Sequence, residues 1–292
     1  MERTHSMQKA GERAWAVMER ELFVSTGGGI RVCALSGEVR RQAALEGAGA
    51  LCAAKEHLLC ACGCGREIFR LDRRTLMPQA VYPGGPGVCE LRLSRDGTHL
   101  LVLCGDADSV MMLDARSGQP LLVSRVGCNP RQMALDGDTL AVAGGESGFV
   151  HLLSAHTLQA AHCLSMPGPV YSTALGRGRV HALCLTPTLD SLLVTALPGG
   201  GRQTLALPGM PGCLLLQGEM LLAATQRRLY AVSADGGRVL WQSAAPGRAN
   251  RLLGEAGWLF VCELLGERLF ACQSPGGRWR MLQAGARDAA IG

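Results

Sequence analysis

The sequence has few aromatic and few charged residues. Only 4% of its 292 residues are Phe, Trp or Tyr and 18% are Asp, Glu, Lys or Arg, whereas hydrophobic residues make up 48%. A chain this apolar does not remain disordered, and its core must be built from Leu, Val, Ala, Met and Cys. The length fits one large all-β domain or two ordinary domains.

Long apolar runs and clustered charges are absent as well. No stretch approaches the roughly 18 uninterrupted apolar residues of a membrane span, and the first residues, MERTHSMQKAGERAWAV, lack a secretory apolar segment. The net charge of +5 is spread along the chain without a Lys/Arg run, which argues against a nucleic-acid partner. We therefore expect a cytoplasmic protein that binds neither membranes nor nucleic acid, with its 13 cysteines reduced.

Motifs of the common enzyme classes are also missing. The sequence contains no GxSxG, HExxH or CxxCH pattern. Its glycine-rich stretches, TGGGI from Thr26 and PGGGR from Pro198, lack the Lys-Ser/Thr pair of a phosphate-binding loop and are interpreted as turns. We expect no cofactor, and no catalytic residue can be named from the sequence.

The sequence does contain a repeated phrase of apolar strand, polar turn and second strand. Seven copies occur about 40 residues apart, with turns at Gly37, Thr75, Gly118, Thr157, Gly201, Gly237 and Gly277. Another hairpin precedes each copy, most clearly at the Asp-Gly turns Asp96-Gly97 and Asp136-Gly137, because glycine tolerates the positive φ of such turns. Gly/Pro breaks separate the units, so each unit is four short strands followed by a crossover.

Four strands in about 40–45 residues is the period of a β-propeller blade. We predict an all-β fold, a seven-bladed β-propeller of four-stranded antiparallel blades that forms a single domain over residues 1–292. The expected blades are approximately 12–46, 47–83, 84–127, 128–167, 168–208, 209–246 and 247–285, with tails 1–11 and 286–292. Residues 12–26 are expected to supply both inner strands of the first blade. One tail should pair across the seam between the first and last blades, because an open seam exposes two sheet faces.

A resemblance to a known family becomes visible in one unit. Residues 83–135, PGGPGVCELRLSRDGTHLLVLCGDADSVMMLDARSGQPLLVSRVGCNPRQMAL, resemble the YVTN-type propeller repeat in the Pro-containing start, the Asp-Gly turn and the G-x-x-P end. That superfamily consists mostly of seven-bladed propellers and includes lactonase-like hydrolases, quinoprotein relatives and non-enzymatic binding proteins. The resemblance therefore implies a fold much more than a chemistry.

The predicted ring has one face on which a ligand site is most expected. Loops that lead into the innermost strands, and loops between second and third strands, emerge together around the channel, where propellers usually bind ligands. The candidate ligand-binding residues at this channel face are Glu90, Asp106, Asn129, Arg131, Glu146, Tyr171 and Arg251. Arginines beside an acid and a tyrosine suit an anionic or polyol ligand. The alternative is that these polar side chains simply line a wet channel.

The stretch CACGCG brings Cys60, Cys62 and Cys64 close together. Three thiolates could hold Zn²⁺ or Cu⁺, but no fourth ligand stands nearby in the sequence. The position of Cys62 is taken by small residues in other units, so we interpret these cysteines as core residues and expect no metal site. Each histidine is interpreted as a surface or satisfied core residue. Asp72 and Asp114, at the ends of third strands, should cap turns.

We therefore expect a non-catalytic binding or scaffold protein, monomeric, that recognises a protein or peptide partner or a small polar metabolite at the channel face. The alternative is a lactonase-like hydrolase acting on a sugar lactone or a similar small anionic or polyol metabolite.

Overall fold

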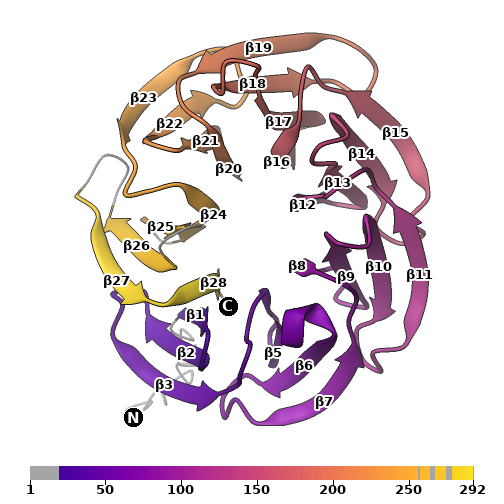
Figure 1. The fold of residues 1–292 in the computed structure, drawn as a ribbon, viewed down its shortest axis with the longest axis vertical. Helices are drawn as coiled ribbons and strands as arrows, with labels where there is room; N and C mark the ends of the chain where they lie inside the picture. Colours follow the sequence, from indigo (N-terminus) through magenta and orange to yellow (C-terminus); the bar gives the residue numbers. More distant parts are fainter. Residues whose placement is uncertain (1–19, 256, 264–266, 274–277, 292) are drawn as a thin grey trace, which may run out of the picture.

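A computed structural model describes residues 20–255, 257–263, 267–273 and 278–291. Seven four-stranded antiparallel sheets stand as blades around a central channel (Figure 1). The predicted all-β seven-bladed propeller is confirmed. Within the described residues, no helix is long and apolar enough to cross a lipid bilayer.

Blades 2 to 7 each run outward from the channel to the rim in chain order. Blade 2 contains β4 (Leu51–Ala53), β5 (His57–Cys62), the short 3₁₀ turn η1 (Gly63–Gly65), β6 (Glu67–Asp72) and β7 (Pro78–Pro83). Blade 3 contains β8 (Val88–Leu93), β9 (His99–Cys104), β10 (Ser109–Asp114) and β11 (Pro120–Arg125). Blade 4 contains β12 (Gln132–Asp136), β13 (Thr139–Ala143), β14 (Phe149–Ser154) and β15 (Ala160–Ser165).

The remaining sequential blades follow the same plan. Blade 5 contains β16 (Val170–Gly176), β17 (Arg179–Leu185), β18 (Ser191–Ala196) and β19 (Arg202–Leu207). Blade 6 contains β20 (Pro211–Gln217), β21 (Met220–Thr225), β22 (Arg228–Ser233) and β23 (Val239–Ala244). Blade 7 contains β24 (Ala249–Glu255), β25 (Trp258–Glu263), β26 (Arg268–Gln273) and β27 (Arg280–Ala284).

The first blade is built from two distant parts of the chain. It contains β1 (Glu21–Thr26), β2 (Gly29–Ala34), β3 (Val39–Ala44) and, as its innermost strand, β28 (Ala286–Ile291). β28 pairs antiparallel with β1, so the tail after blade 7 closes the ring, as expected of one of the two tails. The expectation that residues 12–26 supply both inner strands was wrong, because β28 occupies the innermost place; residues 12–19 lie outside the described residues.

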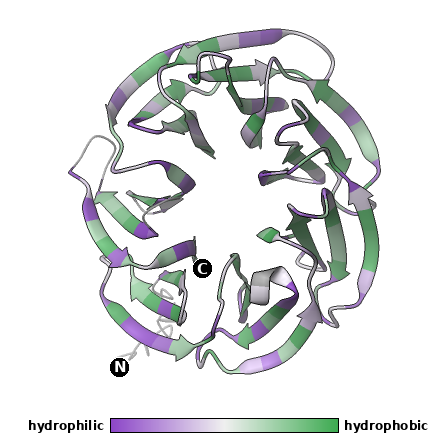
Figure 2. Cartoon of the chain, viewed as in Figure 1, coloured by the Kyte–Doolittle hydropathy of each residue, from purple (hydrophilic) through white to green (hydrophobic). Residues whose placement is uncertain are grey.

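Apolar residues cover both faces of the middle strands. β5 and β9 each have five consecutive buried residues after an opening histidine, whereas the rim strand β11 is mostly exposed. Figure 2 shows the hydrophobic colour along the middle strands, and also on parts of the rim strands such as β11. The buried side chains form seven clusters, and each lies between two neighbouring blades. A blade can therefore bury its apolar faces only against its neighbours.

The turns between third and fourth strands are capped as predicted. Asp72 Oδ1 accepts hydrogen bonds from the Thr75 backbone N–H at 2.7 Å and from Thr75 Oγ1 at 2.8 Å. In the same way, Asp114 Oδ1 accepts hydrogen bonds from the Ser117 backbone N–H at 2.7 Å and from Ser117 Oγ at 2.6 Å. These hydrogen bonds lower the pKa of both carboxyl groups, because they favour the ionised form.

Removing residues 286–292 tests ring closure. The truncated chain loses the β1–β28 ladder and leaves apolar faces of blades 1 and 7 uncovered, so we expect its Tm to fall by roughly 10 °C or more. Thermal unfolding followed by circular dichroism measures the change. Arg287→Ala, an exposed change within β28, serves as the control and should leave Tm nearly unchanged. An unchanged Tm after truncation would show that β28 is dispensable.

Acid should destabilise blade 5 through His181. This side chain is fully buried, its Nδ1 lies 2.9 Å from Thr195 Oγ1, and burial lowers its pKa from 6.5 to about 4. Between pH 6.5 and pH 4, the imidazole of His181 is protonated in the unfolded chain but stays neutral in the folded chain. The free energy of unfolding therefore decreases as the pH falls, by about 3 kcal/mol in all. Urea unfolding from pH 7 to 4 should show this loss in the native protein and in His162→Gln, an exposed control.

In the His181→Gln variant the pH slope should be clearly smaller, although overall stability is lower. A remaining slope is expected from His57 and His151, whose pKa values are also lowered by burial. The same slope in the native protein and in His181→Gln would contradict the assignment.

Candidate functional site

A common feature marks the innermost strands of blades 1, 3, 5 and 7. In each, as also in blade 6, the ladder to the second strand shifts register by one residue near the channel face. The residue just after the shift is polar in all four blades and bonds the neighbouring blade; the four residues are Asp288, Glu90, Ser172 and Arg251. We refer to this set as the inter-blade clamps.

The clamp between the last and first blades is a buried ion pair. Arg251 Nη1 lies 2.8 and 3.1 Å from the two carboxylate oxygens of Asp288. Asp288 Oδ2 also accepts a hydrogen bond from the Leu51 backbone N–H at 2.8 Å, so it connects blades 7, 1 and 2. Burial lowers the pKa of Arg251, but the Asp288 and Glu90 carboxylates outweigh it, and the net pKa is raised. Arg251 is therefore a fixed cation.

The other clamps bond the backbone of the next blade. Glu90, which is 4% exposed, accepts two hydrogen bonds from Arg92 on one oxygen, at 2.7 and 2.9 Å, and one from the Met133 N–H on the other, at 2.5 Å. Ser172 Oγ accepts a hydrogen bond from the Leu214 N–H at 2.7 Å. Both oxygens of Glu90 are thus occupied by donors that belong to the protein.

A polar cavity of about 110 Å³ opens at the channel face. Its lining includes Glu90, Arg131, Arg251 and Asp288. A second cavity of about 440 Å³ shares Arg251 and is otherwise lined mainly by apolar residues of the innermost strands, together with Arg20, Arg92 and Glu255. The sequence-predicted residues Glu90, Arg131 and Arg251 therefore come together at the channel.

Tyr171, the fourth residue expected at the channel mouth, lies between two arginines. The guanidinium carbon of Arg131 is 5.1 Å from the centre of the Tyr171 ring, and that of Arg248 is 5.5 Å away. Neither arginine has a carboxylate within 4.0 Å in the described part of the chain. Sequence reasoning missed Arg248, although it precedes an innermost strand after a Gly/Pro break in the same way as Arg131. We name Tyr171, Arg131 and Arg248 the channel-mouth cluster.

The other three predicted residues lie in loops of blades 3 and 4 or between them, and they do not line the polar cavity. Asp108 Oδ1 accepts a hydrogen bond from the Asn129 N–H at 2.7 Å, and Asn129 Nδ2 lies 3.5 Å from Glu146 Oε1. Asp106 is exposed and lies against Gly87. Asn129, Glu146 and Asp106 are thus joined mainly to the loops of blades 3 and 4.

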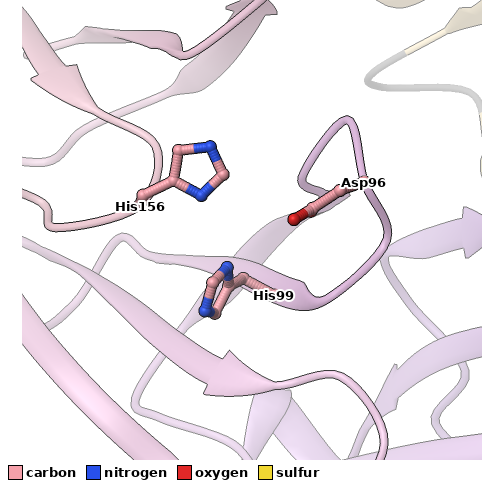
Figure 3. A group of neighbouring side chains, drawn as sticks. All are labelled: Asp96, His99 and His156. Atoms are coloured by element: carbon pink, nitrogen blue, oxygen red, sulfur yellow. The ribbon is translucent and has the colours of Figure 1, made fainter.

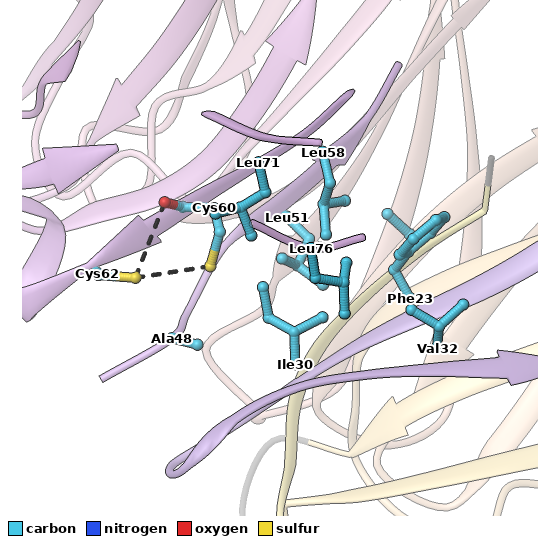
Figure 4. Close-up of a cluster of buried hydrophobic side chains, with 11 residues drawn as sticks. Phe23, Ile30, Val32, Ala48, Leu51, Leu58, Cys60, Cys62, Leu71 and Leu76 are labelled. Carbon is cyan, nitrogen blue, oxygen red and sulfur yellow. Dashed lines mark hydrogen bonds between the residues drawn. The ribbon is translucent and has the colours of Figure 1, made fainter. Parts of the chain in front are cut away.

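Two of the three clustered cysteines, Cys60 and Cys62, belong to the core. Cys60 and Cys62 are buried with their Sγ atoms 3.7 Å apart, among leucines of blade 2 and Ile30 of blade 1 (Figure 4). The contact between the thiols raises the pKa of Cys60 and lowers that of Cys62. The Cys64 side chain lies outside what the structure describes.

A cavity larger than these two lies elsewhere, between blades 1 and 2 on the opposite face. It has a volume of about 720 Å³ and is lined by six cationic and three acidic residues, among others. Arg41 and Arg73 both pair with Glu21, and Arg70 donates to Tyr82 Oη at 3.3 Å and to a backbone carbonyl. Arg73 joins the two blades through Glu21, and Arg41 joins them by donating to the Arg73 carbonyl, whereas the carbonyl that Arg70 reaches belongs to blade 3. Because these guanidinium groups already have partners within the protein, this cleft is a weaker ligand site than the channel mouth.

Comparison with known proteins gives the fold alone. No family description and no curated protein matches the sequence. Among solved structures, a functionally unknown protein from Desulfotomaculum acetoxidans has a TM-score of 0.74 at 10% identity, covering 93% of this chain and 98% of that one. A computationally designed protein has a TM-score of 0.69 at 12% identity, covering 91% and 85%. Kuenenia stuttgartiensis hydrazine synthase has a TM-score of 0.68 at 12% identity, covering 78% and 76%.

The two arginines of the polar cavity should differ sharply in their contribution to stability. Arg251→Met leaves Asp288 buried without its cation and should cost about 3–5 kcal/mol. Arg131→Met removes an exposed side chain and should change the free energy of unfolding by about 0.5 kcal/mol or less. Urea unfolding at pH 7 measures both variants. Equal effects would mean that the Arg251–Asp288 pair does not hold the ring closed.

Proposed function

We propose that this protein is a non-catalytic binding module whose channel mouth takes an acidic segment of a protein or peptide partner. The observation that carries the proposal is the channel-mouth cluster, in which Arg131 and Arg248 flank Tyr171 without a described carboxylate of their own. A guanidinium group binds a carboxylate through two parallel N–H donors. The guanidinium groups of Arg131 and Arg248, on either side of the Tyr171 phenol, therefore suit a segment that carries two or more acidic groups.

The positions of the three residues support a peptide-sized ligand. Arg131 leads into blade 4, Tyr171 lies on β16 of blade 5, and Arg248 leads into blade 7. Three blades thus contribute to one cluster above the channel. Arg131 is exposed, whereas Tyr171 and Arg248 are half-buried, so the cluster is accessible while its ring is held by neighbours.

The state of the acidic residues favours binding over hydrolysis. A lactonase-like enzyme needs a carboxylate that is free to act as a base or nucleophile. In the polar cavity, Glu90 is held by Arg92 and the Met133 N–H, and Asp288 is held by Arg251 and the Leu51 N–H. Both carboxylates are used to hold neighbouring blades together and are not free to act as a base or nucleophile. This supports the non-catalytic proposal.

The proposal includes the finer assignments made from the sequence. Membership of the YVTN-type, lactonase-like superfamily is based on residues 83–135. A monomer in the cytoplasm, without membrane or nucleic-acid partners, is based on the composition. The free thiols of the described cysteines, several of them buried, fit a reducing compartment.

Binding of a fluorescein-labelled decaglutamate peptide, followed by fluorescence anisotropy at low salt, tests the proposal. Arg131→Ala and Arg248→Ala should each weaken binding about tenfold or more, because each removes a charge-assisted contact. Arg227→Ala is the matched control, since it removes an exposed arginine outside the cluster. Decalysine should not bind, and added salt should weaken decaglutamate binding.

Two results would overturn the proposal. One is the absence of decaglutamate binding, or an equal loss in all three arginine variants, which would indicate only non-specific attraction to a basic protein. The other is turnover of a lactone by the native protein that is lost in Glu90→Gln, which would make the protein a hydrolase.

A further inference from the structure

Three potential metal ligands meet on the face opposite the channel mouth. Asp96 lies in the turn between β8 and β9, His99 begins β9, and His156 lies in the turn between β14 and β15. One ligand atom from each side chain lies within 4.8 Å of the other two. In Figure 3 the three side chains point into a common space between blades 3 and 4. No other group of this kind occurs among the residues that the structure describes.

Neighbouring polar groups hold the three side chains in place. Asp96 Oδ1 accepts hydrogen bonds from Ser94 Oγ at 2.6 Å and from the Thr98 N–H at 3.1 Å. Thr98 Oγ1 donates to Asp96 Oδ2 at 2.8 Å and lies 3.0 Å from His99 Nδ1. This hydroxyl joins the carboxylate to the first imidazole.

The second imidazole is oriented by a carboxylate of its own blade. His156 Nε2 lies 3.0 Å from Asp138 Oδ1. When Nε2 donates its proton to Asp138, the lone pair of Nδ1 is available to a metal. Histidine ligands of metals usually donate their other ring N–H to a carboxylate or carbonyl in this manner.

We propose that Asp96, His99 and His156 form a site for a divalent transition metal, with Zn²⁺ as the ion bound. Two imidazole nitrogens and one carboxylate oxygen match the ligands of zinc, and water would fill the fourth position. Tetrahedral zinc places its ligand atoms about 3.3 Å apart, so ligand atoms that now lie within 4.8 Å of one another must approach by up to about 1.5 Å. Asp96 is exposed and the histidines are half-buried, which leaves them room to do so. The bound ion joins blades 3 and 4 independently of the channel mouth.

Titration of chelator-treated protein with ZnCl₂ in a calorimeter tests the site. We expect one equivalent to bind, and this equivalent should be lost in His99→Ala and in His156→Ala. His162→Ala is the matched control, because it removes an exposed histidine from β15 of the same blade. Asp138→Asn should weaken binding by about tenfold, since it removes the partner that orients His156.

The many thiols of this chain require a second measurement that distinguishes ligand types. X-ray absorption of the one-equivalent zinc complex should show nitrogen and oxygen neighbours at about 2.0 Å, whereas cysteine binding would show sulfur at about 2.3 Å. One equivalent of Zn²⁺ should also raise the Tm of the native protein and of His162→Ala but not that of His156→Ala. Sulfur neighbours, or equal binding by the native protein and His156→Ala, would overturn the proposal.

Discussion

Every blade of this protein is apolar on both faces, and this constraint governs the rest of the structure. The seven buried clusters all lie between blades, so a blade without neighbours has no core. The ring must therefore close, and β28 closes it by entering the first blade beside β1. Closure also carries Asp288 to the channel, where it meets Arg251 of blade 7 and the Leu51 N–H of blade 2. The strand that seals the apolar seam thus also supplies a polar clamp.

The clamps divide the polar residues of the channel into two groups. Glu90, Ser172, Arg251 and Asp288 use their hydrogen-bonding groups to fix one blade against the next. A buried charge is tolerated only when paired, and Glu90 and Arg251 both meet this condition within the protein. Arg131 and Arg248 contact the Tyr171 ring of another blade, but within the described residues neither arginine pairs with a carboxylate. The proposed binding of an acidic segment rests on these three side chains.

The structural relatives show how little of the fold depends on particular residues. Proteins that share only 10–12% of their residues with this chain have TM-scores of 0.68 to 0.74, and one of them was designed computationally. What they have in common is a fold, and fold does not fix function. Function in this protein must be argued from sites such as the channel-mouth cluster and the Asp96–His99–His156 group, which belong to its own sequence.

The sequence by itself determined the blades, because strand alternation, Asp-Gly turns and Gly/Pro breaks act over a few residues and recur with a fixed period. The capping by Asp72 and Asp114 was predictable for the same reason, since donors and acceptor lie within three residues. Sequence register also indicated that Glu90, Arg131, Tyr171 and Arg251 belong near the channel. Only the tertiary structure decided what these side chains do there. The pairing of Arg251 with Asp288, the approach of Arg248 to Tyr171 and the meeting of His99 with His156 all join different blades, and a shift of one residue in a strand reverses the face to which a side chain points. Such contacts depend on how the ring closes, and ring closure cannot be predicted from patterns that extend over only a few residues.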